Sequence, residues 1–75
     1  MRVTVRLFAV LRERRGVSTE VFDLPEGTTA RAAYATIFPG LELPVAFAVN
    51  QQSAAADTLL ADGDELALLP PLGGG

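Results

Sequence analysis

The clearest structural signal in the sequence is the segment ELALLPPLGGG at residues 65–75. Successive side chains of a strand point to opposite faces, which puts Leu66 and Leu68 on the buried face. The two prolines that follow end the strand, because a proline ring has no N–H to donate to a neighbouring strand. We therefore expect a core strand, then a stiff extended stem, then three glycines.

Three earlier segments are also expected to form strands, at residues 2–8, 18–24 and 44–50. The first and third alternate in polarity, the third reads as a central strand, and the second puts Phe22 and Leu24 inward. The other side chains expected to point into the core are Val3, Val5, Leu7, Val45, Phe47 and Val49. A sheet of these strands has one face covered and the other exposed to water.

One main helix is expected over residues 30–38, after a threonine N-cap at position 28 or 29. Its apolar stripe, at helical spacing, consists of Ala30, Ala33, Tyr34 and Ile37. A shorter helical turn is expected over residues 9–16, with Gly16 as its left-handed cap. Residues 51–64 are interpreted as a turn, a short strand and a single helical turn.

The order of these elements predicts an α+β fold, a mixed sheet of four to five strands with one main helix packed on one face. Residues 1–72 form the expected domain, and residues 73–75 form a flexible glycine tail. Three acidic residues, Asp62, Asp64 and Glu65, lie in a tight corner before the last strand. We interpret them as a turn, because a calcium-binding EF-hand loop spreads its ligands over about twelve positions.

Composition excludes several kinds of chemistry. The 75 residues include no cysteine and no histidine, which excludes disulfides, a thiolate nucleophile, a persulfide on this chain and histidine-based catalysis or metal binding. The net charge is −3, and six arginines with no lysine carry every fixed positive side chain. We therefore expect no nucleic-acid partner. With neither a bilayer-spanning run nor a signal sequence, we expect no membrane association and a cytoplasmic location.

The glycines at the end have a chemical interpretation. A C-terminal carboxylate is ionised at neutral pH and is a poor electrophile until it is esterified or adenylated. Glycine lacks a Cβ, so Gly73, Gly74 and Gly75 are suited to enter a narrow channel of another protein. The alternative is that the three glycines are only a frayed end of the chain.

Three segments carry a resemblance to a known family: RLFAVLRERRG near the start, FAVNQ in the middle and LLADGDELALLPPLGGG at the end. They resemble the MoaD/ThiS family of sulfur carriers, and within it the small subunits of molybdopterin synthase. The resemblance extends over the whole chain. Arg14 and Arg15 depart from the family pattern, which usually has apolar or small residues there, and Ser53 replaces an expected hydrophobic contact.

The resemblance implies a ubiquitin-like β-grasp fold and a carrier that does no catalysis alone. An E1-like, MoeB-like adenylyltransferase would adenylate Gly75, consuming ATP and magnesium, and a cysteine desulfurase or rhodanese would supply sulfur. The thiocarboxylate on Gly75 would then give its sulfur to cyclic pyranopterin monophosphate within a large, MoaE-like synthase subunit. The chain itself would bind no cofactor and no metal, and it would work as part of a hetero-oligomer.

Docking residues are expected beside the exit of the tail. Phe8 and Leu69 point to the face opposite the helix, and Pro70 and Pro71 form the stem, so these four residues are the predicted partner contacts. Ala46 and Ala48 extend this surface; the alternative is two isolated surface hydrophobes.

Other functions remain open from the sequence. A sulfur carrier for the thiamine thiazole, for thiolated tRNA or for cysteine shares a β-grasp domain with a Gly-Gly end. A ubiquitin-like protein modifier and an inert interaction module are the remaining alternatives.

Overall fold

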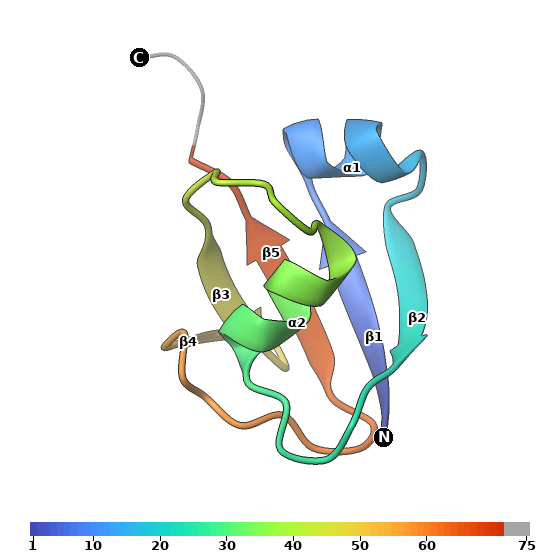
Figure 1. Ribbon diagram of the computed structural model, residues 1–75, viewed down its shortest axis with the longest axis vertical. Coiled ribbons are helices and arrows are strands. Elements are labelled where there is room, and N and C mark those ends of the chain that lie inside the picture. The colour runs from blue at the N-terminus through green and yellow to red at the C-terminus, as the bar shows by residue number, and fades with distance from the viewer. Residues whose placement is uncertain (72–75) are drawn as a thin grey trace.

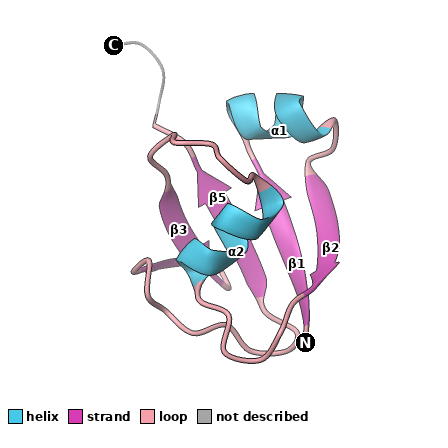
Figure 2. Cartoon of the chain, viewed as in Figure 1, coloured by secondary structure: helices cyan, strands magenta, loops and turns pink. Residues whose placement is uncertain are grey.

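Residues 1–71 fold as one five-stranded sheet with two helices (Figures 1 and 2). The computed structural model describes residues 1–71, so the glycine tail expected at 73–75, and with it the predicted domain boundary after residue 72, lies outside the described residues. The elements are β1 (Arg2–Leu7), α1 (Ala9–Arg15), β2 (Thr19–Asp23), α2 (Ala30–Ile37), β3 (Ala46–Val49), β4 (Gln52–Ala54) and β5 (Glu65–Leu69).

The sheet has the order β2-β1-β5-β3-β4 and is mixed, as expected. Strand β1 pairs antiparallel with β2 but parallel with β5, whereas β3 pairs antiparallel with both β5 and β4. The last strand therefore occupies the middle of the sheet, and β3, expected to be central, lies one place from it. Helix α2 crosses one face of the sheet, and α1 lies at the end where β1 finishes (Figure 1). The predicted α+β class is confirmed.

The core lies between α2 and the covered face of the sheet. Its buried apolar residues are Val3, Val5, Leu7, Leu11, Leu24, Ala30, Ala33, Ile37, Phe38, Phe47, Leu60, Leu66 and Leu68. The alternation in β1 and β5 is confirmed, because Val3, Val5, Leu66 and Leu68 are fully buried. The N-cap of α2 is Thr29, whose side-chain oxygen accepts from the N–H of Ala32 at 3.1 Å.

The single helical turn expected within residues 51–64 is wrong. Residues 55–58 form a hydrogen-bonded turn instead, and Leu59 forms a β-bridge with Thr29. The carbonyls of Ala56 and Thr58 accept from the N–H groups of Arg31 and Ala30, both at 2.9 Å. These carbonyls satisfy donors that the first turn of a helix leaves unpaired. These hydrogen bonds to α2 keep the segment from forming a helical turn. Local sequence preferences do not predict them, because the partners are distant in the sequence.

The turn between β3 and β4 explains the motif FAVNQ. Asn50 and Gln51 have φ values of 52° and 68°, as the two central residues of a type I′ hairpin turn require. The Asn50 side chain also joins this turn to the start of β5. Its oxygen accepts from the N–H of Glu65, and its nitrogen donates to Asp64 Oδ1, both at 3.0 Å.

Replacing Asn50 by alanine should lower the free energy of unfolding by about 2 kcal/mol, since two hydrogen bonds are lost and a Cβ without a local partner remains at positive φ. Gln51→Ala is the matched control, because Gln51 has the same backbone conformation and makes no side-chain hydrogen bond in the described structure. Urea unfolding of the three proteins measures the difference. Equal losses in the two variants would contradict the role of the Asn50 side chain.

Candidate functional site

The last described residues, Pro70 and Pro71, leave the sheet at a defined end of the molecule. Strand β5 runs parallel to β1, so it finishes where β1 passes into α1, and the connection from α2 to β3 reaches the same end (Figure 1). Pro70 is half-buried and Pro71 is exposed. Pro71, the last described residue, therefore lies at the same end of the sheet as Phe8, α1 and the segment 38–45.

Phe8 and Leu69 are neighbours, as the sequence predicts. Leu7 pairs with Leu68, so Phe8 and Leu69 occupy the next position in the register of the two parallel strands. Both side chains are half-buried. Their function as partner contacts stays a prediction.

The guanidinium group of Arg6 covers part of the Phe8 ring. The Arg6 Cζ atom lies 5.8 Å from the centroid of the Phe8 ring, and Arg6 Nη1 is 3.9 Å from Glu65 Oε1. Cation–π contacts at exposed sites are worth about 0.5–1 kcal/mol. Alternation along β1 placed Arg6 on the same face as Phe8, but the contact itself depends on side-chain conformation and was not predicted.

Small side chains continue the surface beside Leu69. Ala46 pairs with Leu69 and Ala48 pairs with Ala67 across β3 and β5. We call Phe8, Leu69, Ala46, Ala48 and Ala67 together the open-face patch. Its centre is flat, because three of its five side chains end at Cβ. Such a surface admits the close approach of a partner without side-chain rearrangement.

The segment 38–45, which borders this end, is fastened by Tyr34. The Tyr34 hydroxyl donates to the Leu43 carbonyl at 2.7 Å, and its ring packs against Phe38 and Phe47 with centroid distances of 5.9 and 6.3 Å. Burial raises the pKa of the Tyr34 phenol above its ordinary value of 10.0, and the positive charge of Arg14 opposes this shift. The phenol therefore stays protonated, and donates, at neutral pH.

Tyr34→Phe should cost about 1 kcal/mol of unfolding free energy at neutral pH through loss of the hydrogen bond to Leu43. In the natural chain, stability should also fall as the pH rises past about 10, because the unfolded phenol loses its proton before the folded one. Urea unfolding near pH 8 and above pH 10 measures both effects. The chain has one tyrosine and no lysine, so an equal alkaline decline in Tyr34→Phe would contradict this assignment.

The acidic corner before β5 has a structural role. Asp62 Oδ1 accepts from the N–H of Arg2 at 2.7 Å, and Asp64 Oδ2 accepts from the N–H of Ala61 at 2.8 Å. The interpretation as a turn is confirmed. Among residues 1–71, no cluster of acidic side chains has an arrangement that would hold a metal ion.

Neither helix α1 nor helix α2 is long and apolar enough to cross a membrane, and these are the helices of residues 1–71. No buried side-chain nitrogen or oxygen in this part of the protein lacks a hydrogen-bond partner. The pKa of Tyr34 is raised, and its hydroxyl already donates a hydrogen bond to the Leu43 carbonyl. The described domain therefore presents surfaces for contact and a stem that leaves from one end.

A mixed five-stranded sheet, with one helix across a face and the last strand in the middle beside the first, defines a ubiquitin-like β-grasp domain. Solved β-grasp proteins match it over the whole chain. The model of the ThiS family matches residues 5–75, and the chain belongs to that family.

Comparison with individual proteins gives a consistent result. The chain is 36% identical over 83 aligned residues to the molybdopterin synthase sulfur carrier subunit of Chlamydomonas reinhardtii, covering all of both chains. It is similar to the crystal structure of SAMP1 from Haloferax volcanii, with a TM-score of 0.80, 30% identity and full coverage of both chains. It also covers all of a chain in the complex of subunits 1 and 2 of the molybdopterin-converting factor from Helicobacter pylori, with a TM-score of 0.63 and 27% identity.

The structure thus brings together Phe8, Leu69, Pro70 and Pro71 at one end of the sheet. Gly73, Gly74 and Gly75, the residues predicted to carry the chemistry, lie outside the described residues. Sequence reasoning missed Arg6 as a neighbour of Phe8 and missed the hydrogen bond from Tyr34 to Leu43. Both contacts depend on the conformations of side chains, which the local sequence does not indicate.

Proposed function

We propose that this protein is the sulfur carrier subunit of a molybdopterin synthase. In this role the Gly75 carboxylate attacks ATP in an E1-like adenylyltransferase and pyrophosphate leaves. A persulfide sulfur of the donor then displaces AMP, and a thiol cleaves the resulting acyl disulfide to release the thiocarboxylate. The thiocarboxylate passes its sulfur to cyclic pyranopterin monophosphate in the large synthase subunit and so helps to build the dithiolene. ATP and magnesium would act in the activating partner, and we propose a cytoplasmic location, where ATP is available.

The observation that carries the proposal is the full-length match to a molybdopterin synthase sulfur carrier subunit, on a fold whose middle strand leads into the stem. Parallel pairing of β5 with β1 puts Pro70 and Pro71, the last described residues, at one end of the domain beside the open-face patch. A carrier needs a docking surface next to its reactive group, so that one interaction positions the other.

The chemistry of the chain agrees with a carrier that is passive by itself. The sequence contains neither cysteine nor histidine, and among the described titratable groups Asp62 serves a turn, Glu20 an ion pair and Tyr34 the contact with Leu43. We therefore assign general acid–base catalysis and substrate binding to the large subunit, and activation to the adenylyltransferase. A hetero-oligomer with the large subunit follows, and the Helicobacter pylori complex of subunits 1 and 2 supports this arrangement.

Removing Gly75, or adding one alanine after it, should abolish sulfur transfer to the pterin without changing the melting temperature. The reaction occurs at a main-chain carboxylate that must reach a fixed position, and a displacement by one residue moves it by about 3.5 Å. The assay combines the carrier, the large subunit and the precursor, and intact mass tests for replacement of oxygen by sulfur. An alanine added before Met1 is the matched control, and activity in the extended Gly75 variant would refute the mechanism.

A protein modifier is the second candidate, because the similarity to SAMP1, a small archaeal modifier protein, reaches 30% identity over the full chain. Both functions use an activated C-terminal glycine, and they differ in the acceptor. Isopeptide-linked conjugates that need Gly75 and persist in cells lacking the large synthase subunit would favour the modifier. Loss of molybdoenzyme activity on removal of Gly75, with no conjugates, favours the sulfur carrier.

Leu69→Gln should weaken binding to the large subunit by roughly tenfold, because an apolar contact at the centre of a small interface is lost. Leu59→Gln is the matched control: Leu59 is 67% exposed, lies outside the open-face patch and follows the turn at 55–58. Isothermal titration of the purified large subunit with each carrier measures the affinities. Equal affinities for the two variants would exclude the open-face patch as the docking surface.

A further inference from the structure

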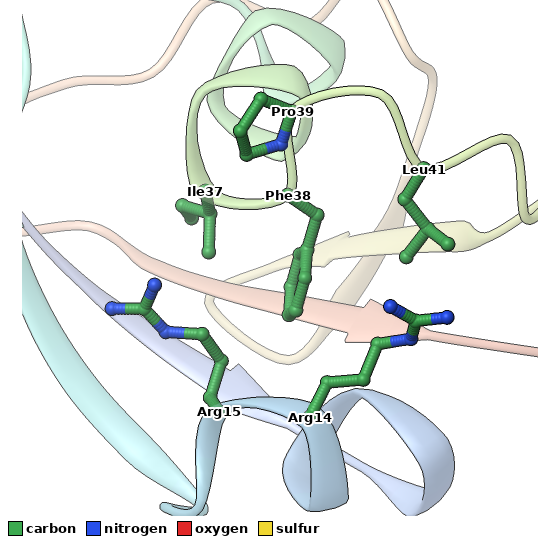
Figure 3. Close-up of a pocket in the computed structure, with 6 residues that line it drawn as sticks. All are labelled: Arg14, Arg15, Ile37, Phe38, Pro39 and Leu41. Carbon is green, nitrogen blue, oxygen red and sulfur yellow. The ribbon is translucent and has the colours of Figure 1, made fainter.

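The two arginines that depart from the family pattern line a hollow on the side of α1 that faces the end of α2. Its other walls come from Ile37, Phe38, Pro39 and Leu41 (Figure 3). Figure 3 shows the Phe38 ring between the side chains of Arg14 and Arg15, both of which extend from α1 toward the segment above. The aliphatic parts of the two arginine side chains thus flank this buried ring.

The two guanidinium groups differ in what they already bind. Arg15 Nη2 donates to both carboxylate oxygens of Glu20, at 2.8 and 2.7 Å, and Arg15 Nε donates at 3.1 Å. The Arg15 Cζ atom also lies 5.3 Å from the centroid of the Phe22 ring. Arg15 is therefore held in place by Glu20 of β2, which also neutralises its charge. Arg14 has no hydrogen bond or ion pair from its side chain within residues 1–71.

We propose that this hollow, the Arg14 hollow, is a second docking site that receives a carboxylate side chain, together with an apolar neighbour, from the partner that takes the tail. The inference rests on the proposed function and adds the chemistry of the contact. Arg14 supplies a planar pair of donors that fits a carboxylate, and Leu41, Pro39 and the Phe38 ring supply an apolar wall beside it.

The size of the hollow supports a side chain as its occupant. Its volume is about 250 Å³, below the range of roughly 300–1,000 Å³ of pockets that enclose whole small ligands. One acidic side chain and one apolar side chain fit such a space. A nucleotide or other polyphosphate would need several donors, whereas Arg14 is the one guanidinium here that Glu20 does not already occupy within the described structure.

The charge around the hollow also selects an acidic partner. Arg12, Arg14 and Arg15 all lie in the last turn of α1 with Glu13 among them, and Glu20 balances Arg15, so this end keeps a small net positive charge. The whole chain has a net charge of −3, so this basic end contrasts with the rest of the protein. A local positive field at the end from which the stem leaves attracts an acidic surface and orients the approach of the partner.

The location connects the hollow with delivery of the tail. Helix α1 follows Phe8 directly, and it lies at the end of the sheet where β5 finishes (Figure 1). A partner that contacts the open-face patch and encloses the residues after Pro71 must approach this end. Contacts at the patch and at the Arg14 hollow, on two sides of the exit, would then hold the domain in one orientation.

The test measures binding of the purified large synthase subunit by isothermal titration, at low and at physiological salt. Arg14→Gln should weaken binding roughly fivefold, and Arg14→Glu should weaken it more than tenfold, because a like charge then faces the acidic side chain. Arg2→Gln is the matched control, since it removes the same charge from an exposed site on β1 that pairs with Asp23. Equal melting temperatures show that each variant is folded.

A double-mutant cycle separates docking in the hollow from long-range attraction. Leu41→Ala should weaken binding by itself and should lose most of its effect when combined with Arg14→Gln, because both residues line the same hollow. Independent, additive effects, or wild-type affinity in Arg14→Glu, would overturn the inference. If the natural carrier and the Leu59→Gln control fail to bind the large subunit at all, the proposed function fails as well, and the two failures are thereby distinguished.

Discussion

The fold depends on the parallel pairing of β1 with β5. Four register pairs join residues about sixty positions apart, and they place the last strand in the middle of the sheet with neighbours on both sides. Leu66 and Leu68 are fully buried there, next to Val5 and Leu7. The same pairing determines where the stem leaves, so the feature that closes the core also fixes the position of Pro70 and Pro71 relative to the open-face patch.

Much of this arrangement was predictable from the sequence, for a physical reason. Alternation of apolar and polar residues in β1 and β5 predicts which of their side chains are buried. The apolar stripe of Ala30, Ala33 and Ile37 likewise predicts the buried face of α2. The caps Gly16 and Thr29, the latter as one of two candidate threonines, could be predicted because each cap depends on local requirements. Gly16 has a φ of 80°, which glycine adopts readily, and the Thr29 hydroxyl accepts a backbone hydrogen bond. Each of these signals lies within a few residues of the feature it predicts.

The features that were not predicted depend on distant parts of the chain. Residues 55–60 have the composition of a helical turn, but their carbonyls and N–H groups pair with Thr28, Ala30 and Arg31. The hollow beside Phe38 is lined by Arg15, which pairs with Glu20, and by Arg14, which has no such partner within residues 1–71. For the candidate site, the sequence located the stem and its neighbours but gave no indication of Arg6 above Phe8, because an alternation pattern assigns a face and not a contact.

The hydrogen bonds between the first turn of α2 and the carbonyls of Ala56 and Thr58 have a consequence for synthesis of the protein. A nascent chain that has just completed α2 lacks these acceptors, and it also lacks the middle strand of its sheet until residues 65–69 leave the ribosome. Stable structure should therefore form only after residues 65–69 have emerged, with the N-terminal half exposed to chaperones until then. A domain with so many distant pairings also folds more slowly than a helical protein of the same length.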